Sequence, residues 1–441
     1  MGNEETSQVL LALSGGGYRA MLFHVGALWR LNELGELNRC THVSSVSGGS
    51  IVAGVLASNW EQLDFDHRGV ARAYRERIAE PLIRLAGYHL DVPAVLVGLI
   101  PIPYLSAARV LECFYRWLLF GNKKLTDIPS SPEFIFNATN VQTGALWSFR
   151  KEAMGDINVG VRKSDVPLAR AVAASNAFPP FLAPVRMRFP DDGWEPYPQV
   201  YGSMKAYDDL AIRSRSIPHE HSKKYRKRVV LADGGIADNL GIVALWRSEG
   251  DLYISDGGGL AKVQARPWRN WLGQLIRTVA LIHDQPSQLR SLTAISRFAD
   301  HDERGQGKES RIQRGDGAYW RMHLPLVRHR DVILPELHEE EITRLATIRT
   351  ALWALSKLKR EQLVNWGYVA ANRSLPYVGR LWRKGSSENP SRAASIFEKH
   401  SLPFPEAGFG PVSTKLSRSS IARRFVRPRF RSFLPRSGSS N

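Results

Sequence analysis

The sequence predicts a mixed α/β protein, because three short apolar stretches each end in a turn rich in glycine or serine. The first, Val9 to Leu13, is followed by three glycines and an apolar helix over residues 18–34. The second, His42 to Val46, ends in a serine turn and passes into another apolar helix. The third, Val229 to Ala232, ends in an Asp-Gly-Gly turn. Strand, turn and helix in alternation are typical of α/β proteins with a parallel sheet.

The serine turn has the order of strand, tight turn and helix that a nucleophile elbow requires. Its sequence over residues 45–49 is SVSGG, with Ser47 at the centre and Gly49 two residues later. Small neighbours are needed because the backbone of the serine in such a turn is strained and packs closely on its surroundings. Glycine is usual where this chain has Ser45. Ser-Gly-Gly is also common in plain loops, so the turn alone leaves both interpretations open.

The glycine turn exposes the N–H groups of Gly15, Gly16 and Gly17 at a helix N-terminus, where the helix dipole favours negative charge. Such a turn can stabilise the oxyanion of acyl transfer or hold a phosphate. The spacing from Gly15 to Ala20 also fits a dinucleotide fingerprint, but the next strand does not end in a carboxylate, and no Gly-Lys-Ser/Thr follows. The nucleotide interpretation is therefore the weaker one. Arg19 is either a surface residue of the helix or an anchor for the loop.

Asp233 lies at the end of a buried stretch, where α/β sheets place their reactive groups. Asp-Gly is also a common turn, so this position has a plain structural interpretation too. A second Asp-Gly-Gly follows another short strand and makes Asp256 a rival.

Together these turns resemble the three signatures of the patatin-like phospholipases, and the glycine block is also similar to that of the cytosolic phospholipase A2 catalytic domain. The matching segments are residues 14–20 (SGGGYRA), the turn around Ser47, and residues 233–235 (DGG). The family signature continues into DNLG at residues 238–241, after Asp233 and not after Asp256, which favours Asp233. The resemblance covers Leu10 to Asp256.

The resemblance implies a three-layer α/β/α fold with a mainly parallel central sheet. Beyond the matching segment, the sequence predicts a helical C-terminal extension and a basic tail. It implies a lipid acyl hydrolase of the phospholipase A or lysophospholipase type that uses a Ser-Asp dyad. The implied site consists of the nucleophile Ser47, the base Asp233, the oxyanion-hole residues Gly15, Gly16 and Gly17, and the supporting residues Arg19, Gly49 and Gly235.

The dyad requires burial of Asp233, because an unperturbed aspartate titrates near about 3.9 and is a poor base. One alternative is a Ser-His-Asp triad that uses His283. However, α/β-hydrolases place several strands before their serine, whereas one precedes Ser47 here. The other alternative is a family member that has lost turnover and binds lipid, for which Ser45 is the hint.

Composition and charge limit the partners. The chain has 441 residues and a net charge of +18, and residues 415–441 contain eight basic residues, interleaved with aromatic ones, and no acidic residue. Such a segment favours an anionic membrane surface, and we expect no specific nucleic acid partner. No carboxylate cluster has calcium-loop spacing, so we expect no metal and no cofactor. Two cysteines, a polar start without a signal peptide and no long apolar run predict a cytoplasmic protein that can associate peripherally with membranes.

We expect the chain to divide into three parts. Residues 8–260 form the acyl hydrolase core, with a basic insertion over residues 189–228. Within the core, residues 80–125 contain an apolar, proline-interrupted segment, which is either buried core or a cap over the serine. Residues 261–410 form a helical part that completes or covers the core, and its apolar spacing predicts one long helix from Glu339 to Trp366. Residues 411–441 form a basic, disordered tail.

Overall fold

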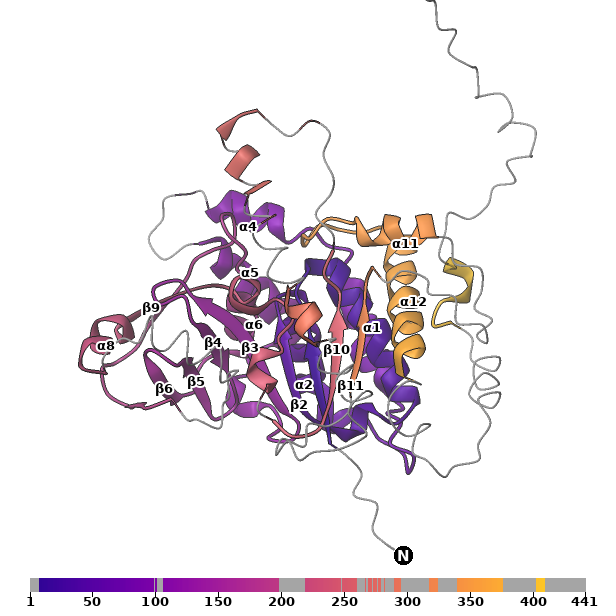
Figure 1. The fold of residues 1–441 in the computed structure, drawn as a ribbon, viewed down its shortest axis with the longest axis horizontal. Coiled ribbons are helices and arrows are strands. Elements are labelled where there is room, and N and C mark those ends of the chain that lie inside the picture. Colours follow the sequence, from indigo (N-terminus) through magenta and orange to yellow (C-terminus); the bar gives the residue numbers. More distant parts are fainter. Residues whose placement is uncertain are drawn as a thin grey trace, which may run out of the picture. The chain divides into compact units, whose positions relative to one another are not determined.

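The central sheet carries the three predicted turns. In a computed structural model, residues 8–98, 100, 106–197, 219–246, 248–259, 317–323, 339–375 and 402–408 are described, with 266, 269–271, 273–275, 277–278, 281 and 289–294. These residues form one mixed sheet with helices packed on it (Figure 1). Its strands are β1 (Val9–Leu13), β2 (Cys40–Val46), β3 (Glu133–Asn140), β4 (Leu146–Phe149), β5 (Ala153–Asp156), β6 (Gly160–Lys163), β7 (Val185–Arg188), β8 (Trp194–Glu195), β9 (Arg228–Asp233), β10 (Asp251–Asp256) and β11 (Gly317–Arg321).

The centre of the sheet is parallel and its far side is antiparallel. The strand order is β11-β10-β1-β2-β3-β4-β5-β6-β8, and β9 pairs with both β3 and β7. The neighbours from β11 to β3 all pair in parallel. Beyond β3 every pairing among the described strands is antiparallel. The mixed α/β class with a parallel centre is confirmed, and the structure adds an antiparallel half to the sheet.

Both faces of the parallel strands are buried. In β1, Val9, Leu11 and Leu13 belong to the larger hydrophobic cluster, together with residues of the flanking helices. Leu10 and Ala12 belong to a second cluster with Leu240, Ile242 and Leu245. Because successive side chains of a strand point to opposite faces, the two clusters lie on the two sides of the sheet. This arrangement explains why β1 is apolar throughout, as is usual for central parallel strands.

The first two α-helices follow the glycine and serine turns, and the next three lie in the predicted cap region. The α-helices are α1 (Gly17–Glu33), α2 (Gly48–Asn59), α3 (Glu80–Leu85), α4 (Asp91–Gly98), α5 (Ala107–Tyr115), α6 (Leu168–Ser175), α8 (His219–Arg226), α9 (Gly235–Asp238), α11 (Glu339–Ala346) and α12 (Lys357–Ser374). Short helical turns are η1 (Leu37–Arg39), η2 (Trp60–Gln62), η3 (Arg75–Ala79), η4 (Arg116–Phe120), η5 (Leu125–Asp127), η7 (Val243–Leu245) and η9 (Pro405–Ala407). Helix α12 runs along α1 (Figure 1). A side chain at Gly26 of α1 would overlap the Val364 carbonyl of α12, which explains this glycine.

The prediction of one long helix from Glu339 to Trp366 is wrong. The structure has two helices there, α11 and α12, and α12 begins at a Ser356 N-cap whose side chain accepts from the N–H of Lys359. Between them, residues 347–355, here called the strap, have no regular helix. The strap is not helical because its backbone groups bond to other elements instead: the Ala351 carbonyl accepts from the N–H of Tyr18, and the N–H of Leu352 donates to Asp91.

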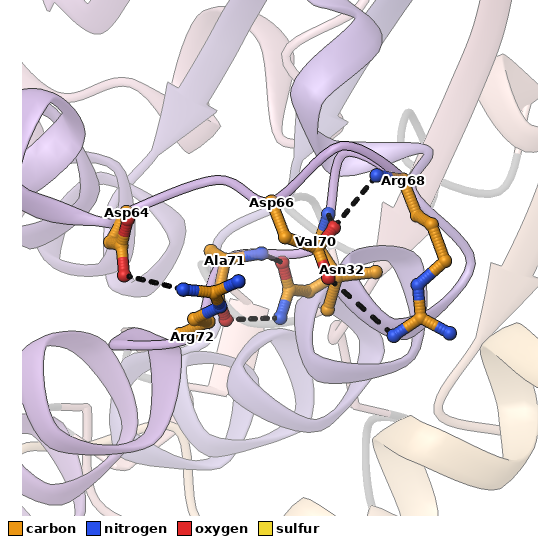
Figure 2. A network of polar contacts seen from close by, with 7 residues as sticks. All are labelled: Asn32, Asp64, Asp66, Arg68, Val70, Ala71 and Arg72. Atoms are coloured by element: carbon orange, nitrogen blue, oxygen red, sulfur yellow. Dashed lines mark hydrogen bonds and ion pairs between the residues drawn. The ribbon is translucent and has the colours of Figure 1, made fainter.

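The loop that follows η2 is fixed to the C-terminal end of α1. The side chain of Asn32 accepts from the N–H of Ala71 at 2.7 Å and donates to its carbonyl at 3.0 Å. Within the loop, Asp66 accepts from the N–H groups of Arg68 and Val70, and Arg72 pairs with Asp64 (Figure 2). The loop therefore packs at the end of α1 that is opposite to the glycine turn.

Three predicted features lie wholly or partly outside the described residues. They are His283, the middle of the 189–228 insertion, and the tail over residues 411–441. The division into core, helical part and tail therefore stays a prediction. Among the described helices, none has the length and apolar character needed to cross a membrane.

Candidate active site

Ser47 lies in a strained turn between β2 and α2. Its backbone has φ 50° and ψ −121°, and it is one of two described residues other than glycine with a positive φ. A serine is rarely held in this conformation unless the surrounding structure enforces it. The side chain is 9% exposed, so solvent reaches it only slightly. The geometry of strand, strained serine and helix is the one that the sequence predicted.

Buried hydroxyl groups form a hydrogen-bond network around the serine turn. The N–H of Ser47 donates to Ser175 Oγ at 2.9 Å, and Ser175 Oγ donates to the Asn137 carbonyl at 2.6 Å. Ser50 Oγ lies 2.9 Å from Ser175 Oγ and donates to Ser45 Oγ, which donates to the Ile135 carbonyl. Ser45 thus fits where a glycine is usual, and its hydroxyl is satisfied. The hint of lost turnover that this residue offered has no support in its packing.

Asp233 reaches Ser47 along the edge of β3. On β3, residues 136 and 137 pair with both β2 and β4, while residues 138 and 139 pair with both β4 and β9. Because a strand has two edges, β2 and β9 share the edge opposite β4. On this edge Asn137 faces Val46, and the next residue, Ala138, faces Asp233. Ser47 and Asp233 therefore meet where β2 ends and β9 arrives from the opposite direction.

The carboxylate of Asp233 is 2% exposed, and this burial raises its pKa to about 7. The N–H of Gly235 donates to Oδ1 at 2.7 Å and opposes the rise. The Ser47 hydroxyl also lies close enough to lower this pKa, but the two groups do not meet the geometry of a formed hydrogen bond. Oδ2 has no hydrogen-bond partner among the described residues. Such contacts often tighten only when substrate binds.

The glycine turn packs directly on the serine turn. A side chain on Gly48 would overlap the Gly17 carbonyl, and one on Gly15 would lie 3.2 Å from Ser47 Cβ. Gly16 and Gly17 have φ of 144° and 61°, a region in which glycine is favoured. The described residues offer no acceptor to the N–H groups of Gly16 and Gly17. These two amides therefore remain free to bind an anion at the start of α1.

Gly15 differs from the expectation that all three glycines donate to an oxyanion. Its N–H already donates to the Asn239 carbonyl at 3.0 Å. Asn239 follows Asp238, whose buried carboxylate accepts from the N–H groups of Leu240 and Val243. Gly15 is thus fixed by the segment after Asp233 and does not offer a free donor. Gly49 is needed for packing, because a side chain there would contact the Leu13 and Ser14 carbonyls.

Arg19 is an anchor for the loop and not a surface residue. Its guanidinium is buried, and Nε donates to the Gly257 carbonyl at 3.2 Å. The two terminal nitrogens donate to the Ile348 carbonyl and to Thr350 Oγ1. Burial lowers the pKa of Arg19 to about 10, which still leaves it charged at neutral pH. Arg19 therefore ties the start of α1 to the strap and to the end of β10.

The rival aspartate, Asp256, has other partners. Its Oδ2 accepts from the Tyr319 hydroxyl at 2.8 Å, and Oδ1 accepts from the N–H of Gly258 at 2.9 Å. It lies at the end of β10, which is separated from β2 by β1. His24 is likewise occupied by Ser255 Oγ at 2.7 Å and the Ser14 carbonyl at 2.9 Å, and burial lowers its pKa to about 4. Neither residue is placed beside Ser47.

Two sets of supporting residues are not among the predicted site residues. Ser175 and Asn176 bind the serine turn, the latter by donating to the Ser47 carbonyl at 3.0 Å. The sequence signal for these two residues is a polar Ser-Asn pair directly after an alanine-rich stretch. The strap was hidden because its apolar spacing continues that of the neighbouring helices. Among the described residues, no group of three His, Cys, Asp or Glu side chains is arranged to hold a metal ion.

The fold and this site define a class of α/β protein with a serine at an elbow, a buried carboxylate next to it and a glycine turn over both. The family model of the patatin-like phospholipases matches residues 11–246, which is more than half of the chain. The chain belongs to the patatin-like phospholipase family. A comparison with curated proteins finds no match.

A comparison with solved structures finds similarity to human GIVD cytosolic phospholipase A2 in complex with methyl gamma-linolenyl fluorophosphonate. This similarity covers 84% of the present chain and 58% of that chain, at 16% identity and a TM-score of 0.44. VipD from Legionella pneumophila is similar over 83% of the present chain and 66% of its own, at 16% identity and a TM-score of 0.32. The present chain therefore spans less than two thirds of the length of either protein.

Proposed function

We propose that the protein is a lipid acyl hydrolase of the phospholipase A or lysophospholipase type, with Ser47 as nucleophile and Asp233 as base. The observation that carries the proposal is the meeting of a strained serine and a buried carboxylate with a free oxygen. A carboxylate with a pKa of about 7 is a competent base near neutral pH, whereas an ordinary aspartate is not. Membership of the patatin-like phospholipase family supports a lipid ester as the substrate.

The reaction follows from the placement of these groups. Ser47 Oγ attacks the ester carbonyl carbon while Asp233 Oδ2 accepts the hydroxyl proton. The N–H groups of Gly16 and Gly17 stabilise the negative oxygen of the tetrahedral intermediate. The bond to the leaving alcohol then breaks, and Asp233 returns the proton to that oxygen. Water attacks the acyl-Ser47 ester by the same route, which releases the fatty acid and restores the serine.

Replacing either member of the dyad should abolish ester hydrolysis while the protein stays folded. We expect Ser47→Ala and Asp233→Asn to lower kcat for p-nitrophenyl butyrate and for a dispersed phospholipid by at least about 1,000-fold, because each removes a group that acts in the transition state. The measurement is initial rate, with circular dichroism as the check on folding.

Matched controls are Asp256→Asn, which changes the rival carboxylate, and Ser58→Ala, which changes another serine of α2. Both should keep turnover close to that of the unmodified chain. Retained activity in Ser47→Ala, or loss of activity in Asp256→Asn with Asp233→Asn still active, would contradict the assignment.

A further inference from the structure

Three side chains have buried polar atoms without hydrogen-bond partners among the described residues. They are Tyr18, Tyr115 and Asp91, here called the tyrosine–aspartate cluster. The hydroxyls of Tyr18 and Tyr115 and Asp91 Oδ1 are all buried and have no hydrogen-bond partner among the described residues. Tyr18 is 1% exposed and Tyr115 is 0% exposed. Asp233 Oδ2 is a fourth atom of this kind.

The cluster is held together by one short piece of the strap. The N–H of Tyr18 donates to the Ala351 carbonyl at 3.1 Å, and the N–H of the next residue, Leu352, donates to Asp91 Oδ2 at 2.7 Å. Tyr18 directly follows Gly17, a proposed donor to the oxyanion. Asp91 begins α4 and Tyr115 ends α5, and these two helices pack on each other.

Backbone contacts place the cluster beside the glycine turn, because a side chain on Gly17 would lie 2.6 Å from the same Ala351 carbonyl oxygen that accepts from Tyr18. Burial raises the pKa of Tyr115, and the charges of Tyr18, Asp91 and Asp233 raise it further. Burial raises the pKa of Tyr18, and Asp91 adds to this effect. Such charge effects are strongest between groups that lie close together in the interior, so they agree with this placement. The tyrosine–aspartate cluster therefore lies beside the glycine turn, which packs on the serine turn.

Three other buried or half-buried tyrosines in the described part of the chain have hydrogen-bond partners. The Tyr74 hydroxyl donates to the Val25 carbonyl at 2.7 Å, and the hydroxyls of Tyr253 and Tyr319 bond to Glu36 and Asp256. Native proteins rarely leave a buried hydroxyl without a partner, and a phenylalanine would fill the same space without this cost. Two such hydroxyls and a carboxylate oxygen in one place indicate that a ligand completes their hydrogen bonds.

We propose that the tyrosine–aspartate cluster binds a hydrogen-bond donor of the lipid substrate, either a hydroxyl or an ammonium group, close to the ester that Ser47 attacks. This inference rests on the proposed function and adds the substrate class to it. A carboxylate accepts hydrogen bonds, and a tyrosine hydroxyl can donate or accept. Asp91 and Asp233 disfavour an anionic group at this place, since like charges repel.

The basic groups near the cluster do not offset this preference. Arg19 uses its guanidinium for Gly257, Ile348 and Thr350. Burial raises the pKa of Asp91, and His89 only partly opposes this rise. His89 Nδ1 accepts from the N–H of Ala354. A phosphate therefore has no free cation to bind among these residues, whereas a neutral or positive donor finds several acceptors.

The test compares matched esters that differ in one donor. A 1-monoacylglycerol is compared with its dimethyl ether, and a phosphatidylethanolamine with the corresponding phosphatidylcholine. The unmodified protein should favour the donor-bearing member of at least one pair in kcat/KM, and which pair shows the preference distinguishes a hydroxyl from an ammonium group. Tyr18→Phe, Tyr115→Phe and Asp91→Asn should each reduce this ratio about tenfold, the effect of one lost hydrogen bond to a buried group.

Tyr74→Phe is the matched control, because it removes a buried tyrosine hydroxyl that has a protein partner. It should keep the substrate ratio and lower the melting temperature. Tyr18→Phe and Tyr115→Phe should melt at or above the temperature of the unmodified protein, because they remove a hydroxyl without a partner. Ratios unchanged in all three cluster variants, or a clear fall in their melting temperature, would overturn the inference.

Binding keeps this test separate from turnover. A 1-O-alkylglycerol has no ester to cleave, so its effect on the melting temperature reports binding alone. It should stabilise the unmodified protein more than its dimethyl ether does, and the cluster variants should lose the difference. If p-nitrophenyl butyrate is not hydrolysed, the proposed function fails, and this binding comparison still decides the role of the cluster.

Discussion

At the scale of single residues, the proposed mechanism depends on the environment of one carboxylate. Asp233 is buried, has one oxygen bonded to the N–H of Gly235 and has the other free near Ser47. Its pKa of about 7 places half of the molecules in the basic form at neutral pH. Burial raises this pKa because desolvation disfavours the charged form. The protonated fraction of Asp233 therefore increases as the pH falls below about 7.

The pH dependence of turnover should reflect this group. The base must be a carboxylate, so kcat/KM for p-nitrophenyl butyrate should rise with pH, with a midpoint near 7, and level off above it. The measurement is the rate profile between about pH 5 and pH 9. A midpoint near the ordinary value of an aspartate, about 4, would show that burial does not control the base. The rise of kcat/KM with pH should be absent in Asp233→Asn. If the rise persists in this variant, it comes from the titration of another residue.

At the scale of elements, the strap and Arg19 hold the glycine turn. Arg19 binds the strap at Ile348 and Thr350 and the end of β10 at Gly257, so one side chain links three segments that are distant in the sequence. The backbone of Tyr18 adds a further bond to the strap. The positions of Gly16 and Gly17 therefore depend on a segment more than 300 residues away.

Loss of this anchor should reduce both activity and stability. Arg19→Met leaves two buried carbonyls without donors, and we expect a fall of about 2–4 kcal/mol in the free energy of unfolding. Displaced amides at Gly16 and Gly17 should also lower kcat/KM by about 100-fold. Urea unfolding and p-nitrophenyl butyrate hydrolysis measure the two effects.

Asn32→Ala is the matched control, because Asn32 fixes a loop at the other end of α1 (Figure 2). Along the helix axis, Asn32 lies roughly 20 Å from Arg19. It should lower stability by about 1–3 kcal/mol and leave kcat/KM unchanged. Equal losses of kcat/KM in both variants would mean that activity reports only stability, and that Arg19 has no special role in holding the turn.

The sequence was sufficient for elements whose local pattern and tertiary role agree. Strands β1, β2, β9 and β10 and the helices α1 and α2 lie where apolar runs and turns predicted them. The strap was missed because its backbone bonds to Tyr18 and Asp91 override a helical pattern. The direction of β9 was also hidden, since pairing depends on β3, which lies about 90 residues earlier. Gly15 shows the same limit of prediction from sequence. Its N–H donates to the carbonyl of Asn239, and this long-range hydrogen bond decides which amides of the glycine turn stay free.

At the scale of the whole molecule, two features favour contact with a lipid surface. The apolar segment around α4 is partly exposed, with Val92 at 44%, Leu96 at 61% and Ile100 at 46%. Of the two predictions for this segment, exposure favours a cap over a fully buried core. The second feature is the basic tail, which lies outside the described residues and stays a prediction. A positively charged chain with exposed apolar side chains is suited to an anionic bilayer.

Deletion of residues 415–441 should weaken binding to anionic vesicles. The tail contains eight basic residues, and each basic residue near an anionic surface contributes about 1 kcal/mol. Co-sedimentation with phosphatidylserine-containing vesicles should fall, and salt should weaken binding of the full chain more than that of the deleted one. Phosphatidylcholine vesicles are the control. Equal binding of the two chains to anionic vesicles would show that the tail has no part in it.

The central claim is that Ser47 is an activated nucleophile. A fluorophosphonate reacts covalently with such serines, so the most direct measurement is labelling of the full chain followed by mass spectrometry of its peptides. We predict one adduct, on Ser47, and much slower labelling in Asp233→Asn, because the base is lost. No adduct, or an adduct on another serine with Ser47 unmodified, would contradict the account.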